Sequence, residues 1–217
     1  MKKRAAIALI LALCGALLAS ACAPKAIGEA KAKEIGLAYI NQVFDVDETE
    51  ATVTSEQVEC FPYQDGAIVT DGDASIATRL IYRVRVAKSE SITLYEAYVN
   101  ASTGVPYFAR QNEINIVLTN EQKEKANTLF SAERSWGEKH VAALQEMKIA
   151  CIQWVEANQM GDCPVLLAVE KEGAERNQIS TTFWQGYYVV MRDGTIYDMS
   201  ILWPSMKLLH FGILNEQ

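Results

Sequence analysis

The chain has 217 residues, half of them hydrophobic, and a formal net charge of −7. This length accommodates one medium domain or two small ones, and the apolar content excludes a wholly disordered chain. The excess of acidic residues argues against a nucleic-acid-binding protein, because phosphate binding needs clustered Lys and Arg side chains.

Residues 1–21 have the pattern of a secretory signal peptide. Three basic residues, Lys2, Lys3 and Arg4, precede an uncharged apolar run at residues 5–19. These are the n-region and h-region of an export signal. The run is shorter than the roughly 20 apolar residues that a membrane-spanning helix needs. We therefore expect a signal that is removed, rather than a permanent transmembrane helix.

Small residues lead directly into a cysteine in the segment Leu18-Ala19-Ser20-Ala21-Cys22, which resembles the lipobox of bacterial lipoproteins. The resemblance implies cleavage before Cys22 and lipidation of its sulfur, with acyl chains such as palmitate. Residues 22–26 would then be a tether that holds the protein on the extracytoplasmic face of the cell membrane. The alternative is ordinary secretory cleavage after the Ala19-Ser20-Ala21 triplet.

Without its three N-terminal basic residues the formal charge of the chain becomes −10. Anionic lipid headgroups would repel such a body, so membrane attachment would depend on the lipid itself.

The next part of the chain predicts a helix followed by antiparallel strands. Apolar residues recur at helical spacing over residues 27–44. Partial or clear alternation, typical of strands, follows at residues 51–61, 79–87 and 93–100, with a continuation at 105–108. A Gly- and Asp-rich loop with Asp65, Asp71 and Asp73 separates the first two strands. We interpret it as a solvated turn rather than a Ca²⁺ site, because its spacing is not that of an EF-hand.

The remaining part repeats this order. A helical pattern covers residues 119–160, with a bend expected near Gly137 and a core stripe of Leu144, Met147, Cys151 and Val155. Strand patterns return at residues 165–170, 181–191 and 195–203, and the last two flank the hairpin signal Arg192-Asp193-Gly194. The sequence therefore predicts an α+β fold of two tandem units, residues 27–113 and 119–217, each a helix packed on an antiparallel sheet.

The first unit resembles the PepSY domain over about residues 26–110. The resemblance rests on the helix phrase Glu29-Ala30-Lys31-Ala32-Lys33-Glu34-Ile35-Gly36-Leu37-Ala38, the strand Ile81-Tyr82-Arg83-Val84-Arg85-Val86, and the strand and turn Tyr95-Glu96-Ala97-Tyr98-Val99-Asn100-Ala101-Ser102-Thr103-Gly104. It implies a cystatin-like fold, in which a helix packs across a curved antiparallel sheet, and a binding or regulatory role without a catalytic centre. By this pattern the second unit would be a diverged copy.

Few residues are suited to catalysis. The two histidines are His140, which we interpret as a solvated helical residue, and His210, which we interpret as a half-buried ring. No nucleophile elbow, zinc-protease motif or phosphate-binding glycine loop is present in the sequence. We therefore expect a protein that is not an enzyme and needs no cofactor or metal.

Three cysteines follow Cys22, namely Cys60, Cys151 and Cys163. A disulfide between Cys151 and Cys163 would close a short loop between a helix and the next strand, as is common in exported proteins. Buried free thiols are an equally good interpretation. None of the three has metal-ligand spacing.

Aromatic residues gather on the predicted C-terminal hairpin, at Phe183, Trp184, Tyr187, Tyr188, Tyr197 and Trp203. A hairpin presents alternate residues to opposite faces, so one face fills a core and the other can meet a partner. Although core packing explains most such clusters, this hairpin is the first place to expect a binding surface, formed by Trp184, Tyr187, Tyr188, Tyr197 and Trp203.

Together these patterns predict a membrane-anchored lipoprotein that binds another protein, such as an envelope peptidase or a cell-wall hydrolase. Two alternatives stay open from the sequence. The first is a structural or assembly lipoprotein of the cell envelope, and the second is a small-ligand binder or an enzyme without a familiar motif.

Overall fold

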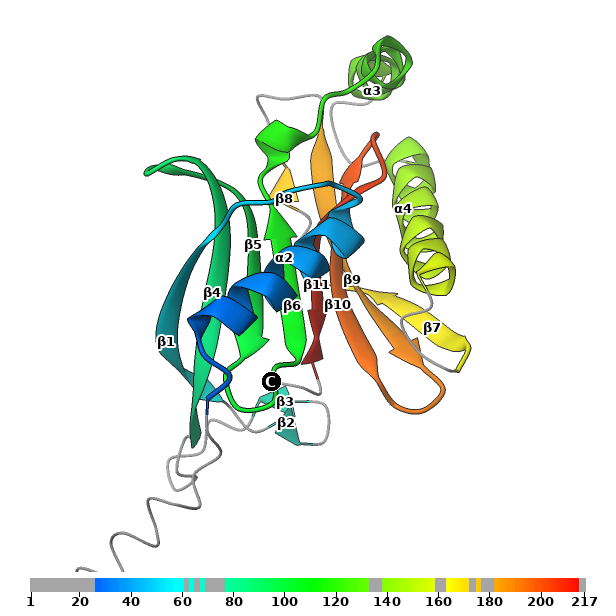
Figure 1. Ribbon diagram of the computed structural model, residues 1–217. Helices are drawn as coiled ribbons and strands as arrows, with labels where there is room; N and C mark the ends of the chain where they lie inside the picture. The colour runs from blue at the N-terminus through cyan, green and yellow to red at the C-terminus, as the bar shows by residue number, and fades with distance from the viewer. Residues whose placement is uncertain are drawn as a thin grey trace, which may run out of the picture.

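The computed structural model describes residues 26–60, 63–64, 67–68, 77–132, 138–158, 163–171, 175–176 and 182–214. The signal peptide, Cys22 and the acidic loop residues Asp65, Asp71 and Asp73 lie outside these ranges, as does the side chain of Cys60. The described residues form helices and strands around one large antiparallel sheet (Figure 1).

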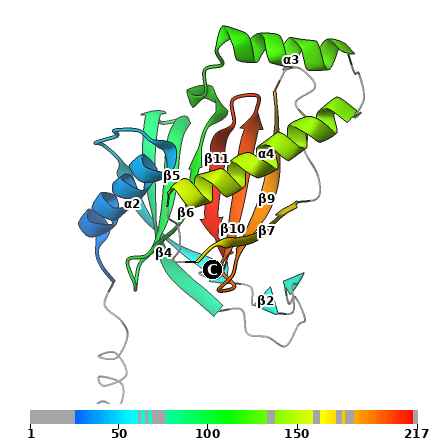
Figure 2. The ribbon, with the colours of Figure 1, turned by 90° about the vertical axis from the view of Figure 1, so that its right-hand side faces the viewer.

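The helices are α2 (Glu29–Phe44), α3 (Asn120–Ala132) and α4 (Glu138–Ala157), with a short 3-10 turn η1 (Glu113–Asn115). The predicted helix at residues 27–44 is confirmed. The single bent helix predicted at residues 119–160 is wrong, because this segment forms two helices that run in different directions (Figure 2). Gly137 lies between them, and a glycine inside a continuous helix costs about 1 kcal/mol relative to alanine.

In the described ranges, no helix is both long and apolar enough to cross a membrane.

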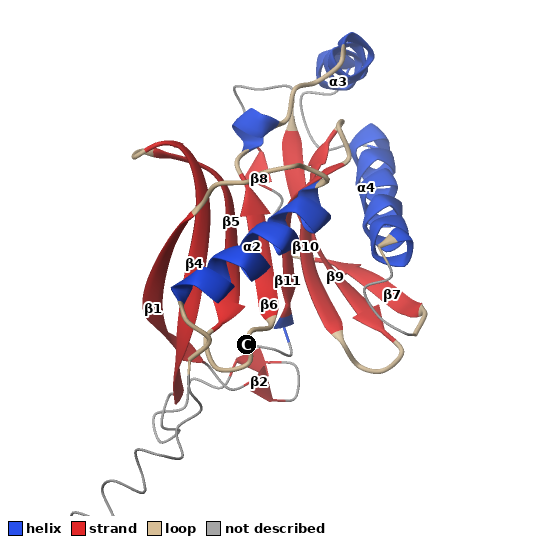
Figure 3. Cartoon of the chain, viewed as in Figure 1, coloured by secondary structure: helices blue, strands red, loops and turns tan. Residues whose placement is uncertain are grey.

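The large sheet joins strands from both halves of the chain (Figure 3). Across the sheet the order is β1 (Thr52–Cys60), β4 (Ala77–Ser89), β5 (Ile92–Asn100), β6 (Pro106–Gln111), β11 (Lys207–Ile213), β10 (Ile196–Trp203), β9 (Phe183–Met191) and β7 (Val165–Glu170). The short β8 (Glu175–Arg176) also pairs with β9, while β2 (Tyr63–Gln64) and β3 (Ala67–Ile68) pair separately.

The predicted strands are confirmed within a few residues at each end, and β7 has the predicted bounds. Strand β11 was not predicted. Its sequence Leu208-Leu209-His210-Phe211 does not alternate, and its pairing with β10 shifts register between Ser200 and Ile201. At a bulge of this kind the side chains no longer alternate strictly between the two faces, and strand prediction depends on that alternation.

The structure confirms an α+β fold but does not divide the described residues into two separate sheets. Strand β6 pairs with β11, so the sheet continues from one half of the chain to the other. The largest buried cluster also contains residues of both halves. Phe211 contacts Tyr39 of α2 and Trp154 of α4, with ring centroids 6.4 and 4.9 Å apart, so both helices cover the same face.

A row of directly opposed side chains on that face crosses six strands. Its members are fully buried and lie on β4, β5, β6, β11, β10 and β9 in that order: Val84, Ala97, Ala109, Phe211, Met199 and Tyr187. Because successive residues of a strand point to opposite faces, this row determines which residues lie on the other side of the sheet.

Helix α2 approaches β4 most closely at Gly36. A Cβ atom at this position would lie 2.5 Å from Cγ2 and 2.7 Å from Cβ of Val84. Such distances are inside van der Waals contact, so the helix can reach this position against the sheet because residue 36 lacks a side chain.

We expect Gly36→Ala to lower the free energy of unfolding by about 1–2 kcal/mol, because overpacking outweighs the helix propensity that alanine adds. Urea unfolding measures this change. In a Val84→Ala background the same substitution should cost less, since both Cγ methyl groups of Val84 are gone and only its Cβ atom remains within 3 Å. An equal loss in both backgrounds would show that the contact with Val84 is not the cause.

Candidate functional site

The sheet face opposite the helices, which we name the outer face, carries the polar side chains of the central strands. A second row of directly opposed residues crosses the same six strands, at Arg85, Glu96, Arg110, His210, Ser200 and Gly186. Each is adjacent in sequence to a member of the buried row, so it points away from α2 and α4. None of the three described α-helices packs on this face.

Further residues lie on the outer face two positions along each strand. They are opposed in the same way and comprise Arg83, Tyr98, Phe108, Gly212, Asp198 and Tyr188. The outer face therefore combines three arginines, two carboxylates and several aromatic rings, whereas the helix-covered face is apolar.

Glu96 and three arginines form the first charged group on this face, which we name the arginine cluster (Arg83, Arg85, Glu96 and Arg110). The Glu96 side chain is fully buried, and its Oε1 accepts a hydrogen bond from Nε of Arg83. Its Oε2 accepts from Nε and Nη2 of Arg110 at 3.1 and 2.8 Å. Arg85 instead donates to the hydroxyl of Thr93. One carboxylate thus binds two of the three guanidinium groups.

The pKa of Glu96 reflects two opposing causes. Desolvation by burial raises it, but the hydrogen bonds and positive charges of Arg83 and Arg110 outweigh burial, and the net pKa lies below the ordinary glutamate value. Glu96 is therefore ionised at neutral pH, and its charge holds two guanidinium groups in fixed positions.

The second charged group, the lysine cluster, consists of Lys171, Asp198 and His210. Nζ of Lys171 lies 2.9 and 2.8 Å from the two carboxylate oxygens of Asp198, and Nε2 of His210 lies 3.9 Å from Oδ2. The stem of Lys171 crosses Gly186, where a Cβ atom would lie 2.7 Å from Cδ of Lys171. The glycine in the polar row therefore leaves room for the lysine.

Stacked rings connect the two clusters. Tyr98 stacks on Phe108 with centroids 4.7 Å apart, and Phe108 meets the ring of His210 edge-on at 4.8 Å. Desolvation by burial lowers the pKa of His210 more than the carboxylate of Asp198 raises it, so this ring is neutral at pH 7. The prediction of a half-buried His210 is confirmed.

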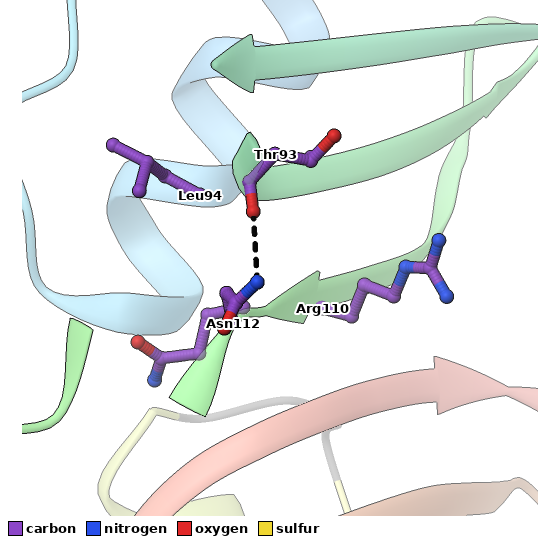
Figure 4. Close-up of a pocket in the computed structure, with 5 residues that line it drawn as sticks. Thr93, Leu94, Arg110 and Asn112 are labelled. Carbon is purple, nitrogen blue, oxygen red and sulfur yellow. Dashed lines mark hydrogen bonds between the residues drawn. The ribbon is translucent and has the colours of Figure 1, made fainter. Parts of the chain in front are cut away.

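A pocket of about 300 Å³ opens beside the arginine cluster, where β5 begins and β6 ends. It is lined by Thr93, Leu94, Arg110, Gln111 and Asn112. Figure 4 shows the side chain of Arg110 extending away from Leu94, while Nδ2 of Asn112 donates to the carbonyl oxygen of Thr93 at 3.3 Å. The pocket therefore offers a guanidinium group beside amide and hydroxyl groups.

The aromatic surface predicted on the C-terminal hairpin is largely wrong. Tyr187, Tyr197 and Trp203 are buried on the helix-covered face with Phe183, and the hydroxyl of Tyr187 donates to the carbonyl of Leu144 on α4 at 2.7 Å. Trp184 and Tyr188, which alternate with these residues along β9, are partly exposed on the outer face. The hairpin therefore fills the core with three of the five predicted residues and contributes two to the outer face.

His140 is buried and contacts the rings of Phe130 and Phe183, with centroids 5.8 and 6.1 Å away, so its prediction as a solvated residue is wrong. It precedes Ala143 and Met147 by three and seven residues, which places it on the buried side of α4.

Cys151 and Cys163 are free thiols in the structure, with Cys151 on the buried side of α4 and Cys163 partly buried. Burial raises the pKa of Cys151 to about 12, so this thiol is protonated and unreactive at neutral pH. The described residues contain no group of three side chains able to hold a metal ion.

Sequence reasoning missed Glu96, Arg110, Lys171 and Asp198. The available signal was a charged residue inside an otherwise apolar or aromatic strand, as at Glu96 in Tyr95-Glu96-Ala97-Tyr98 and Asp198 in Tyr197-Asp198-Met199. A charge in a central strand needs a partner on a neighbouring strand. The identity of that partner depends on the register of the two strands, which cannot be read from the sequence.

The sequence matches no protein-family model and no curated protein. Among solved structures, the Bacillus megaterium YpeB C-terminal domain is similar to this chain, with a TM-score of 0.40 and 9% sequence identity. The similarity covers 88% of this chain and 65% of that domain, so the chain spans less than two thirds of its length.

We expect Glu96→Gln to lower the free energy of unfolding by about 2 kcal/mol at pH 7, because two guanidinium groups lose their shared counter-charge. The wild-type contribution is present above the unfolded-state pKa near 4.5 and is lost as pH falls through the lower folded-state value. The variant should therefore lose less stability than the wild type between pH 6 and pH 3, as measured by urea unfolding.

Glu146→Gln provides the control, since Glu146 pairs with Lys125 at 2.7 Å but both side chains are about half exposed. Its effect should stay below about 0.5 kcal/mol. Equal effects of the two substitutions would contradict a special role for Glu96.

Proposed function

We propose that this chain is a membrane-anchored lipoprotein of the extracytoplasmic face that acts as a protein-binding or regulatory module. The observation that carries the binding role is the outer face, where charged and aromatic groups stand in two ordered rows that no described helix covers. Aromatic and arginine side chains are the residue types enriched in protein interfaces.

The anchor part of the proposal depends on the lipobox at residues 18–22. Two or more acyl chains on Cys22 give firm attachment, because each buried methylene contributes about 0.8 kcal/mol. Such an anchor needs no membrane-spanning helix in the folded body and no attraction between an acidic body and anionic lipid.

We also propose that the fold consists of two PepSY-like, cystatin-like units joined edge to edge. This is supported by the strand order, in which β1-β4-β5-β6 of the first half is followed by β11-β10-β9-β7 of the second. The first half has one helix and the second has two, α3 and α4. In each half four main antiparallel strands follow, and the last strand of each half lies at the junction. A pairing of two such units through their last strands produces this mirrored order.

The proposed role is binding rather than catalysis. Glu96 and Asp198, the two carboxylates of the clusters, are both held in ion pairs with arginine or lysine side chains, so their oxygens are already occupied. The PepSY resemblance directs the search for a partner to envelope peptidases and cell-wall hydrolases, and the alternative is a structural partner of the envelope.

The anchor is tested by Cys22→Ser in a bacterial host. The wild-type chain should gain the mass of a lipid on its N-terminal cysteine and stay in the membrane fraction, whereas the variant should keep its signal or be released. Cys163→Ser is the matched control and should be lipidated normally. Cleavage and release of the wild-type chain without lipid would favour ordinary secretion.

The binding role is tested with a photo-reactive amino acid in living cells. In the test variant it replaces Thr54, an exposed residue that lies opposite Arg83 on the outer face. In the control variant it replaces Val141, an exposed residue of α4. We expect one peptidase or hydrolase to be cross-linked from position 54 and not from position 141. Cross-links to structural envelope proteins alone would favour the assembly alternative, and identical products from both positions would contradict binding at the outer face.

A further inference from the structure

The arginine cluster has more positive charge than the described residues around it neutralise. Both oxygens of Glu96 accept hydrogen bonds from Arg83 and Arg110, so this carboxylate has no free side for Arg85. Within the described residues, the guanidinium group of Arg85 hydrogen-bonds only to the neutral hydroxyl of Thr93 and forms no ion pair. The four residues together carry a formal charge of +2, which Glu56 beside Arg83 offsets in part.

These charges are available to a ligand. The Arg110 side chain is 51% exposed, and its two bonds to Glu96 use Nε and Nη2, which leaves Nη1 directed away from that carboxylate. The Arg85 side chain lies beside Thr93, and both Thr93 and Arg110 line the pocket at the ends of β5 and β6 (Figure 4). Arg110 thus lines the pocket itself, and the guanidinium group of Arg85 is hydrogen-bonded to Thr93, another of its lining residues.

The groups around the hollow are held in place before any ligand arrives. Hydrogen bonds hold Arg110 to Glu96 and Arg85 to Thr93. Asn112, on the other side of the pocket, donates a hydrogen bond to the carbonyl oxygen of Thr93. A preordered guanidinium loses little side-chain entropy when it binds, which favours planar, bidentate recognition of a carboxylate.

The surroundings restrict the size of the anion. Glu56 lies close enough to Arg83 to affect it electrostatically, and in the lysine cluster the charge of Lys171 is already matched by Asp198. The chain as a whole is acidic. A long polyanion would meet repulsion beyond the three arginines, whereas a single carboxylate would not.

We propose that Arg85 and Arg110, with the pocket beside them, bind a carboxylate group of a partner polypeptide. This deepens the binding role proposed above and rests on it for its biological meaning. The carboxylate is a glutamate or aspartate side chain or a chain terminus, since the same guanidinium geometry accepts each of them.

The test uses the full chain in detergent and a fluorescent, amidated hexapeptide with one glutamate among glutamines, with fluorescence anisotropy at low salt as the measurement. The wild type should bind this peptide and not a matched hexaglutamine peptide. Arg85→Gln should weaken binding about tenfold, because one charge-assisted hydrogen-bond pair is lost. Arg85→Lys keeps the charge without the planar, bidentate guanidinium group, so its affinity should fall between those of the wild type and Arg85→Gln.

Arg192→Gln is the control, because Arg192 is exposed in the β9–β10 turn and this substitution removes the same charge far from the pocket. Its affinity should change less than about twofold. An equal loss in Arg192→Gln and Arg85→Gln would overturn the site in favour of general charge attraction. Arg85 is chosen because no carboxylate of the described residues depends on it, and urea unfolding confirms that each variant is folded.

Further probes separate the sources of the anion. The amidated peptide and its form with a free carboxyl terminus distinguish a side chain from the chain end, and either result supports the proposal. Inorganic phosphate and phosphatidylglycerol vesicles are then tested as competitors of the labelled peptide. If either displaces it more strongly than the unlabelled peptide does, and Arg85→Gln abolishes that competition, the site is not specific for carboxylates and the proposal is wrong. Failure of peptide binding beside successful cross-linking from position 54 would remove this site but keep the proposed function.

Discussion

The pairing of β6 with β11 is the constraint on which the rest of the structure depends. Three residue pairs, Arg110 with His210, Ala109 with Phe211 and Phe108 with Gly212, join the two halves of the chain. The middle pair points to the helices, where Phe211 packs against both α2 and α4. A register slip of one residue here would turn Phe211 to the outer face and His210 into the core, so the shared core and the outer face are specified together.

The charged outer face follows from this register. Glu96 pays a desolvation cost that its guanidinium partners on β4 and β6 offset, and a pair of this kind is weak evidence for stability alone. Its partners lie on the two strands that flank β5, so the ion pairs form together when β4, β5 and β6 are in register. We therefore interpret the arginine cluster as a device that fixes strand register and, through its excess charge, prepares a binding site.

Much of the fold could be predicted from the sequence, because apolar periodicity is a local property. Strand β4 alternates Tyr82, Val84 and Val86 with Arg83 and Arg85, and the structure buries the first set and places the second on the outer face. Strand β11 was missed because its bulge interrupts the alternation. The prediction for the aromatic hairpin was wrong because Tyr197 and Trp203 lie on the same side of β10 as the buried Met199, which the two-residue period of a strand could have shown. The partners of Glu96, in contrast, depend on pairing between distant segments.

An ordered outer face also suits a protein tethered at a membrane. With the proposed lipid on Cys22, the chain and a membrane-associated partner would share a thin layer, which raises their effective concentration. Under this condition a modest interface suffices, and selectivity comes from where charges are placed rather than from a large buried area. The arginine cluster meets this need, because Glu96 and Thr93 already hold the guanidinium groups, so that a partner carboxylate is recognised without further ordering of the sheet.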